Sequence, residues 1–425
     1  MRRCSCCLMI CLLASGLLVR GEENDWPTFR GADRTGVAPD TGLLDQWPEG
    51  GPTLLWEVDG MGRGYSSPAI ASDQVFILGD GLSTTEDSDE YLICVNRADG
   101  KELWRFKTGE PWEKRGPESW QSSRSTATVD GDRVYTLTAF GQLYCLNTKT
   151  GEEVWKRHLK DDLDGNKADS WGYSESVTID GEKLICTPGG GSNTLVALNK
   201  LNGELIWNCT NPDDIGAGHA SVVISEIAGN KIYVQTTGSG AMGVQASDGQ
   251  LLWTYGIPKT TAVIPTPIVR DDLVFFTAGY GLGGALLKQV PNNDGGVDIE
   301  EIYPNSPALQ NKHGGVVLVG DHLYGDSGDS GTPYCAELMT GDIAWKSRGS
   351  GRKSASVVAA DGKIFVRYSN GVMTMVNASP EEFTEQGSFK TPGSGERPSW
   401  AHPVIADGKL YLREGDKLLC YDLRK

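Results

Sequence analysis

The stretch Cys145–Trp155, CLNTKTGEEVW, decides the fold, because the same pattern occurs five times along the chain. Each copy has a small residue, a polar turn that contains glycine, and a tryptophan ten residues after the small one. The other copies are CVNRADGKELW (94–104), ALNKLNGELIW (197–207), GVQASDGQLLW (243–253) and CAELMTGDIAW (335–345). A turn glycine between two short apolar runs is typical of a β-hairpin.

The tryptophans that end these five stretches, together with one more upstream, recur about every fifty residues, which indicates one repeated structural unit. They are Trp56, Trp104, Trp155, Trp207, Trp253 and Trp345. The one long gap closes if Tyr303 takes the place of a tryptophan, and Phe389 then supplies the next position. A second hairpin signature recurs in phase with the first, as in VDGDRVYTL from Val129 and ADGKLYLR from Ala406. The unit is therefore four short strands, with the tryptophan predicted to pack between neighbouring units.

Repeats of four strands with this period are typical of β-propeller blades. We predict an all-β fold, an eight-bladed propeller of four-stranded antiparallel blades. The last repeat, from Ala401, lacks a fourth strand, whereas PTLLWEV (Pro52–Val58) has no strands before it. Pairing the N-terminal strand with the C-terminal blade would close the ring and remove an open sheet edge. We expect a signal peptide at 1–20, an N-terminal extension at 21–52 and the propeller at 53–425.

The first residues predict export from the cytoplasm. Arg2 and Arg3 precede an apolar run, Leu8–Val19, that is too short to span a bilayer and has the proportions of a secretory signal peptide. We expect the protein in the periplasm or outside the cell, as a monomer without stable membrane insertion. The formal net charge of −17 and the absence of a Lys/Arg cluster argue against nucleic-acid binding.

The cysteines outside the leader are predicted to be free and buried. Cys94, Cys145 and Cys335 each stand ten residues before a tryptophan, where sister repeats carry Ala197 and Gly243. A position that accepts Cys, Ala or Gly requires a small buried side chain, and a free thiol satisfies that requirement. We therefore expect no disulfide.

The repeated signature resembles the tryptophan-docking motif of quinoprotein-type propellers. That group includes the pyrroloquinoline quinone (PQQ) dehydrogenases and the propeller lipoprotein of the outer-membrane barrel-assembly machinery, BamB. The segments WPTFRG (26–31), SWGYSES (170–176), HGGVVLVGDHLYG (313–325) and PSWAHPVIADGKLYLR (398–413) resemble exported PQQ-like repeat proteins of planctomycete-type bacteria. The resemblance covers nearly the whole chain after the leader and implies the fold, because one propeller can host many activities.

The resemblance does not extend to the PQQ cofactor. PQQ dehydrogenases hold it between a tryptophan and a disulfide of adjacent cysteines, near Ca²⁺ and a catalytic aspartate. The only adjacent pair in this chain, Cys6-Cys7, lies in the leader. We therefore expect no cofactor.

Candidate binding residues gather in the segments that enter each innermost strand, because these segments surround one mouth of the central channel. Aromatic, basic and histidine side chains in such a ring suit a small molecule or a glycan. The plainer alternative is that they cap strands and line a water-filled channel. The candidates are Trp120, Arg124, Trp171, Tyr173, His219, His313, Lys353, Trp400 and His402.

Neither metal chemistry nor a known catalytic motif stands out. The histidines share no local spacing, so we expect no metal site. Asp162, Asp164 and Asp169 have the oxygen density of a Ca²⁺ loop but not the order of an EF-hand, which leaves calcium as a weak alternative.

We therefore expect a non-catalytic exported propeller that acts as a binding or scaffold module for an envelope protein. The alternative is a small-molecule or glycan site at the channel mouth, with or without catalysis. PQQ-dependent dehydrogenase is the weakest of the three.

Overall fold

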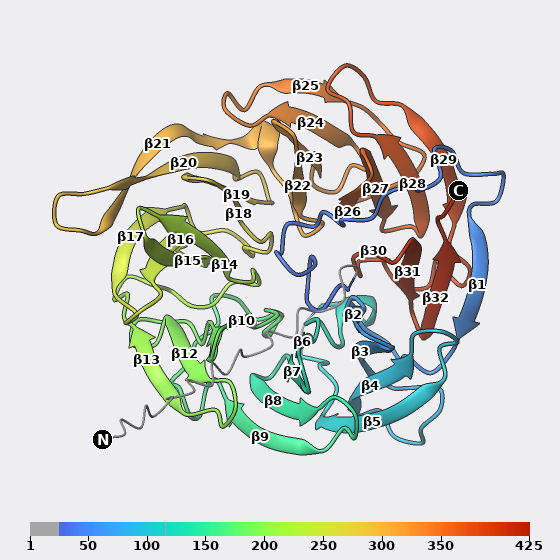
Figure 1. Cartoon of the computed structure of the whole chain (residues 1–425), viewed down its shortest axis with the longest axis horizontal. Coiled ribbons are helices and arrows are strands. Elements are labelled where there is room, and N and C mark those ends of the chain that lie inside the picture. Colours follow the sequence, from blue (N-terminus) through green and yellow to red (C-terminus); the bar gives the residue numbers. More distant parts are fainter. Residues whose placement is uncertain (1–24, 115) are drawn as a thin grey trace, which may run out of the picture.

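The chain forms a ring of eight blades, each a four-stranded antiparallel sheet (Figure 1). The structure is a computed structural model that describes residues 25–114 and 116–425. Both the predicted all-β class and the predicted number of blades are confirmed. The predicted signal peptide lies outside the described residues.

Blades I to IV follow one another along the chain, each with its innermost strand first. Their strands are β2 (Ala69–Ala71), β3 (Gln74–Asp80), β4 (Glu90–Asn96) and β5 (Glu102–Gly109) in blade I; β6 (Thr128–Asp130), β7 (Arg133–Leu137), β8 (Gln142–Asn147) and β9 (Glu153–His158) in blade II; β10 (Thr178–Asp180), β11 (Lys183–Cys186), β12 (Leu195–Asn199) and β13 (Leu205–Cys209) in blade III; and β14 (Val223–Ile227), β15 (Asn230–Thr237), β16 (Gly240–Gln245) and β17 (Leu251–Gly256) in blade IV.

Blades V to VIII complete the ring. Their strands are β18 (Ile268–Arg270), β19 (Leu273–Ala278), β20 (Gly283–Pro291) and β21 (Val297–Ser306) in blade V; β22 (Val316–Val319), β23 (His322–Asp326), β24 (Pro333–Glu337) and β25 (Ile343–Lys346) in blade VI; β26 (Ala355–Ala360), β27 (Lys363–Tyr368), β28 (Val372–Asn377) and β29 (Glu385–Lys390) in blade VII; and β30 (Val404–Ala406), β31 (Lys409–Glu414), β32 (Lys417–Asp422) and β1 (Thr53–Val58) in blade VIII.

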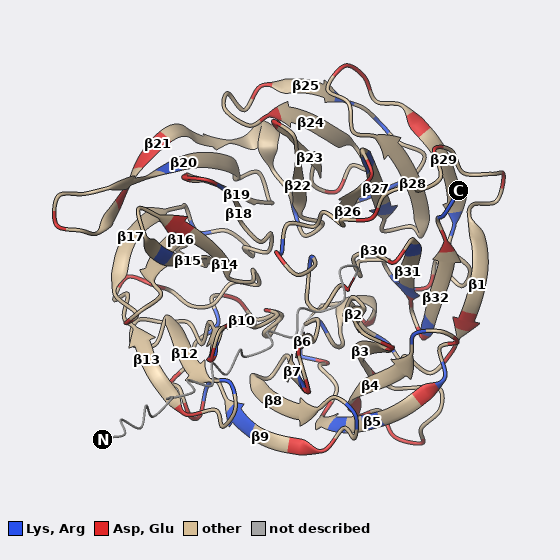
Figure 2. Cartoon of the chain, viewed as in Figure 1, with Lys and Arg blue, Asp and Glu red and all other residues tan. Residues whose placement is uncertain are grey.

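Helical structure in the described residues is limited to two short 3₁₀ turns, η1 (Glu118–Trp120) and η2 (Pro307–Leu309). None of the described helices is both long and apolar enough to span a membrane. Lys and Arg are interspersed with Asp and Glu around the ring rather than gathered on one blade (Figure 2).

The two ends of the propeller meet in blade VIII, as predicted. Strand β1 pairs antiparallel with β32, in a register that runs from Thr53 opposite Asp422 to Val58 opposite Leu418. The sheet order is β1-β32-β31-β30, so the segment before blade I supplies the outermost strand of the last blade. This pairing covers the edge of β32 that would otherwise be open.

The docking tryptophan of blade II, Trp155, fills a space that two small residues leave open. Trp155 lies opposite Cys145 in its own blade, and its indole Nε1 donates to Lys200 O of blade III at 3.0 Å. A Cβ on Gly203, the turn glycine of blade III, would lie 2.8 Å from this ring. Two carbon atoms cannot approach this closely, so a side chain at Gly203 would collide with the indole. The glycine of the repeated motif is therefore required for packing between the blades.

Most of the other rings in this position make the equivalent contact with the following blade. The turn glycines Gly100, Gly151, Gly249 and Gly341 lie against Trp56, Trp104, Trp207 and Tyr303, in that order. Trp345 donates its indole N–H to Ser379 O of the next blade at 2.8 Å. Trp253 packs in the apolar cluster between blades IV and V. Tyr303 pairs with Leu286 in the tryptophan register, as the sequence predicted.

Blade VII departs from the prediction. Gly387, not Phe389, lies opposite Met375 at the position where other blades carry a tryptophan, so the assignment of Phe389 is wrong by two residues. The space above Gly387 is filled by Trp47 of the N-terminal extension, and a Cβ on Gly387 would lie 2.7 Å from the Trp47 Cβ. The blade thus takes its aromatic ring from a distant part of the chain, which spacing within the repeats cannot indicate.

The N-terminal extension crosses the centre of the ring before it reaches β1 (Figure 1). Trp26 and Ile70 of β2 exchange two backbone hydrogen bonds, and Ala38 N donates to Ala359 O of β26 at 2.8 Å. Two buried arginines fix the segment further: Arg34 Nη1 donates to Ser176 O at 2.9 Å and Arg30 Nη2 to Val316 O at 2.5 Å. The extension therefore occupies part of the centre of the ring, which the repeat pattern does not indicate.

Candidate functional site

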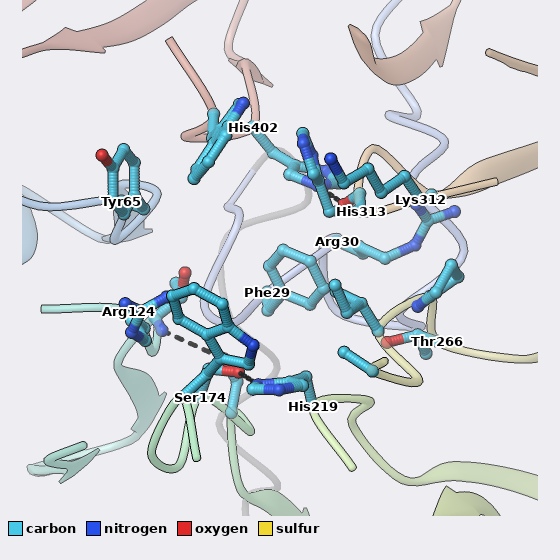
Figure 3. Close-up of a pocket in the computed structure, with 18 of the residues that line it drawn as sticks. Phe29, Arg30, Tyr65, Arg124, Ser174, His219, Thr266, Lys312, His313 and His402 are labelled. Carbon is cyan, nitrogen blue, oxygen red and sulfur yellow. Dashed lines mark hydrogen bonds between the residues drawn. The ribbon is translucent and has the colours of Figure 1, made fainter. Parts of the chain in front are cut away.

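A cavity of about 170 Å³ lies at the channel mouth that the sequence singled out (Figure 3). Its floor is Phe29 and Arg30 of the extension. Its walls are Tyr280 and the segments that enter the innermost strands of every blade except blade VII. Seven of the nine predicted site residues line it: Trp120, Arg124, Trp171, His219, His313, Trp400 and His402.

The other two predicted residues lie elsewhere. Tyr173 is buried in the apolar cluster of blades II and III, where its hydroxyl donates to Pro188 O at 2.9 Å. Its place in a mouth segment did not reveal that its ring faces the core. Lys353 is exposed, and blade VII contributes none of the residues that line the cavity.

Several cavity residues were missed, although the sequence carried a signal for most of them. Tyr65, Ser174 and Lys312 stand in the mouth segments GYSSP, SWGYSES and NKHGG. Phe29 and Arg30 belong to WPTFRG, which nothing in the repeat pattern places at the centre of the ring. Tyr280 comes from the β19–β20 connection, which does not lead into an innermost strand.

Aromatic rings form a continuous arc along one side of the cavity. The ring centroids of Tyr65 and Trp400 are 5.0 Å apart, and Trp120 lies 6.0 Å from both Trp400 and Trp171. The His313 ring lies 4.8 Å from Trp400. Such rings present flat apolar faces on which a planar ligand can stack.

The charged residues that line the cavity are all cations: Arg30, Arg124 and Lys312. Arg124 lies 5.9 Å from the Trp171 ring and donates to Trp120 O at 2.6 Å. Arg30 Nη1 is buried, without a hydrogen-bond partner among the described residues. Burial lowers the pKa of Arg30 to about 10, so its guanidinium keeps its charge at neutral pH. Lys312 Nζ is paired with Asp329 Oδ2 at 2.5 Å, so the positive charge of the cavity comes mainly from Arg30 and Arg124.

Two of the three histidines in the cavity are neutral at neutral pH. Burial lowers the pKa of His313 to about 4 and that of His402 to about 3. His313 Nε2 lies 2.9 Å from Ser354 Oγ, and His402 Nε2 lies 3.3 Å from His313 O.

The third histidine, His219, contacts a serine on one side and a carboxylate on the other. Its Nδ1 lies 2.6 Å from Ser174 Oγ, and its Nε2 lies 2.8 Å from Asp169 Oδ2 (Figure 3 shows Ser174 beside His219). Asp169 Oδ1 in turn accepts the backbone N–H of Trp171 at 2.9 Å. Ser174 is partly accessible in the cavity wall, whereas the side chains of His219 and Asp169 are 5% and 9% exposed.

The acidic residues considered for calcium do not act as one ligand set. Asp169 is engaged with His219, and Asp162 Oδ2 accepts the His158 N–H at 2.8 Å. Among residues 25–114 and 116–425, three or more His, Cys, Asp or Glu side chains nowhere gather as a metal site would require. The expectation of no metal remains a prediction.

The described residues do not provide the lid that PQQ dehydrogenases use. Their six cysteines, Cys94, Cys145, Cys186, Cys209, Cys335 and Cys420, are far apart in sequence, and each is free and buried. A disulfide between adjacent cysteines cannot form from this set. The absence of bound PQQ stays a prediction.

The chain is similar to known proteins in sequence and in fold. The family described as "Outer membrane protein assembly factor BamB" matches residues 88–347, from blade I to blade VI. The BamB of Yersinia pestis is 23% identical over 393 residues, which cover 85% of this chain and 86% of that protein. The tetrathionate hydrolase of Acidithiobacillus ferrooxidans is 24% identical over 331 residues, which cover 76% of this chain and 53% of that enzyme.

Solved structures show the same fold at lower identity. The BamB of Moraxella catarrhalis has a TM-score of 0.61 at 16% identity and covers 87% of this chain and 97% of its own. The quinohemoprotein alcohol dehydrogenase of Comamonas testosteroni has a TM-score of 0.63 at 12% identity, with coverages of 95% and 81%. An outer membrane protein assembly factor and an alcohol dehydrogenase thus share one fold, so the fold alone does not select an activity.

Proposed function

The chain belongs to the outer membrane protein assembly factor BamB family, and from this premise we propose that it is an exported propeller that binds an envelope protein. The observation that carries the proposal is a row of exposed apolar residues on the outer rim. In blades VIII, I, II and III, the residue immediately before the docking tryptophan faces solvent: Leu55, Leu103, Val154 and Ile206 are 41% to 48% exposed.

These residues lie on β1, β5, β9 and β13, the outermost strands of four neighbouring blades (Figure 1). Each fourth strand also presents an unpaired edge, which can pair with an extended segment of another chain. Apolar side chains repeated along a solvent-facing rim favour a partner that buries them. We infer that the partner is an envelope protein that offers an extended apolar segment to this rim.

The rim is tested with charge substitutions and affinity capture from envelope extract. Leu103→Glu and Ile206→Glu should abolish recovery of a stoichiometric partner that the unchanged protein captures. Leu201→Glu is the matched control, because Leu201 is 50% exposed but lies in the β12–β13 turn, off the rim strands. A partner recovered equally by all three variants, or by no form of the protein, contradicts the proposal.

A second candidate function is the binding of a small organic anion in the mouth cavity. The specific support is the lining, where Arg30 and Arg124 stand beside the aromatic arc, whereas the third cation, Lys312, is paired with Asp329. Isothermal titration should detect benzoate but not benzylammonium, and Arg124→Gln should weaken benzoate binding. Lys353→Gln, on the exposed loop outside the cavity, should leave it unchanged. Equal binding of both probes contradicts this candidate.

A further inference from the structure

The hydrogen-bonded series Ser174–His219–Asp169 points to a reaction. We propose that the mouth cavity is an esterase site in which Ser174 is the nucleophile, His219 the general base and Asp169 the residue that orients the base. The inference departs from our expectation of a non-catalytic module. It does not depend on the rim, since the two surfaces are separate parts of the ring.

The hydrogen positions in this series follow from its chemistry. A carboxylate can only accept, so Asp169 requires the His219 proton to lie on Nε2. The neutral ring then has its lone pair on Nδ1, at 2.6 Å from Ser174 Oγ, and the serine hydroxyl must be the donor. In enzymes that use a hydroxyl nucleophile, the serine typically donates to a histidine, and a carboxylate orients that histidine. The three residues here have this arrangement.

The charge states of the two buried groups support these assignments. Burial by itself would raise the pKa of Asp169, but His219, the Lys167 ammonium and the Trp171 N–H together hold it below its usual range. Burial and Lys167 lower the pKa of His219, against the opposing effect of Asp169. At neutral pH the series therefore contains an ionised carboxylate and a neutral imidazole, which is the form a base requires.

The ring nitrogens are exchanged relative to the familiar serine-protease triad, where the serine contacts Nε2 and the carboxylate contacts Nδ1. The exchange preserves the roles, because each nitrogen still makes one short hydrogen bond and the ring still carries one proton. A triad is recognised by such geometry and roles rather than by sequence order.

Two adjacent blades fix the three residues. Asp169 and Ser174 lie in the segment before β10, and Gly172 between them adopts φ 83°, a conformation suited to glycine. A Cβ at Gly172 would lie 2.7 Å from Ala139 O, so the turn is held against blade II. His219 precedes β14 and is anchored by its N–H, which donates to Val263 O at 2.8 Å. Base and carboxylate are buried, while the nucleophile faces the cavity.

The remaining lining suggests the substrate class. The Arg124 guanidinium lines the same cavity, and its Nε is buried without a partner among the described residues. A cation so placed can stabilise the negative charge that develops on a carbonyl oxygen. An engineered apolar cavity of about 150 Å³ accepts benzene, so this slightly larger one has room for a single ring or a short acyl chain. We infer small carboxylic esters, with preference for those that also carry a negative charge.

The reaction balances with water as the only co-reactant. Ser174 Oγ bonds to the carbonyl carbon while its proton passes to His219 Nδ1. The ester C–O bond breaks, and the leaving alkoxide takes that proton as an alcohol. Water then attacks the acyl-serine, gives a proton to Nδ1 and releases the acid, and the proton returns to Ser174.

The test uses phenylmethylsulfonyl fluoride, a single-ring serine reagent, and p-nitrophenyl acetate as a chromogenic ester, with the intact protein. We expect one adduct per chain, mapped to Ser174 by peptide mass spectrometry, and steady hydrolysis of the ester. Ser174→Ala should remove both signals. His219→Gln and Asp169→Asn should each slow labelling about a hundredfold or more.

Ser354→Ala is the matched control. Ser354 Oγ also lies 2.9 Å from a histidine, His313, but that histidine has no carboxylate on its other nitrogen. This variant should label at the unchanged rate. Melting curves of all variants identify any loss of fold, and Ser174→Ala, which removes only a hydroxyl, should melt like the parent.

The pH profile of labelling separates a base from a purely structural histidine. The rate should rise through a pKa below the ordinary 6.5 of histidine, because burial, Lys167 and Arg124 lower it against Asp169. The proposal is overturned if the folded parent protein forms no adduct at Ser174 and hydrolyses no ester. It is also overturned if the reagent labels the His219→Gln variant at the same rate as the parent. Neither result would change the capture of a partner on the rim. The esterase proposal and the proposed function can therefore be contradicted separately.

Discussion

At the scale of single residues, the propeller depends on matched volumes at the contacts between blades. Where the ring is a tryptophan, its cross-strand neighbour is small: a Cβ on Gly243 would lie 2.2 Å from the Trp253 indole. In blade VII the sizes are reversed, with Met375 opposite Gly387, and Trp47 fills the space. Cores of this density tolerate such exchanges only when total volume is conserved.

The first residue-scale prediction concerns Trp155, which is 8% exposed and packs on Gly203 of the next blade. Trp155→Ala should lower the free energy of unfolding by roughly 3–5 kcal/mol, the usual cost of deleting a large buried aromatic ring. Denaturant titration measures it. An unmoved midpoint would mean that the indole is not an inter-blade contact.

A second residue-scale prediction concerns Glu90, a buried carboxyl whose partners are the hydroxyls of Thr108 and Ser123, both at 2.8 Å. Burial raises its pKa from 4.5 to about 7. The folded state therefore binds its proton more tightly than the unfolded state. Its contribution to stability is present below pH 4.5 and is lost as the pH rises through 7.

Glu90→Gln should remove this dependence, because an amide keeps hydrogen bonds without titrating. Relative to the parent, the variant should gain up to about 3 kcal/mol between pH 5 and pH 8. Thermal unfolding at the two pH values measures the gain, and Glu182→Gln, an exposed acid, is the control. If the free energy of unfolding of the variant differs from that of the parent by the same amount at both pH values, Glu90 does not titrate with a raised pKa in the folded protein.

At the scale of secondary-structure elements, β1 determines whether the ring is closed. It is far from β32 in sequence, yet it completes the sheet of blade VIII. Its side chains are mostly exposed, so its main contribution is to cover the β32 edge rather than to add apolar core.

Replacing Pro52–Val58 by a Gly-Ser linker of equal length should therefore produce aggregation rather than slight destabilisation. Light scattering after size exclusion measures it. The same replacement at the β20–β21 hairpin tip, residues 292–296, is the control and should stay soluble, since that turn leaves every blade complete. A soluble monomer with unchanged melting would refute the closing role of β1.

At the scale of the whole molecule, the extension holds the blades together from the inside. It forms hydrogen bonds with blades I, II, III, VI, VII and VIII, and supplies both Trp47 and the cavity floor. The blades are thus not independent repeats, and stability should depend on the intact ring.

A whole-molecule prediction follows from the distribution of the thiols. Cys94, Cys145, Cys186, Cys209, Cys335 and Cys420 are each buried in a blade. Titration in denaturant without reductant should therefore count six thiols in the protein that lacks the leader. A count of four or fewer would contradict the absence of disulfides.

The sequence by itself determined the blade count, the strand order and the closure by β1, because these depend on local hairpins that repeat with a fixed period. It also located seven of the cavity residues, since each stands just before an innermost strand. Only the tertiary structure decided the rest. Trp47 replaces a missing repeat aromatic, Phe29 and Arg30 fill the centre, and Ser174 meets His219 across two blades. The contacts of Trp47, Phe29 and Arg30 involve an extension that stands outside the repeats, so periodicity carries no signal for them. Ser174 and His219 stand 45 residues apart, about one repeat, so periodicity places them in neighbouring mouth segments but does not show that their side chains meet.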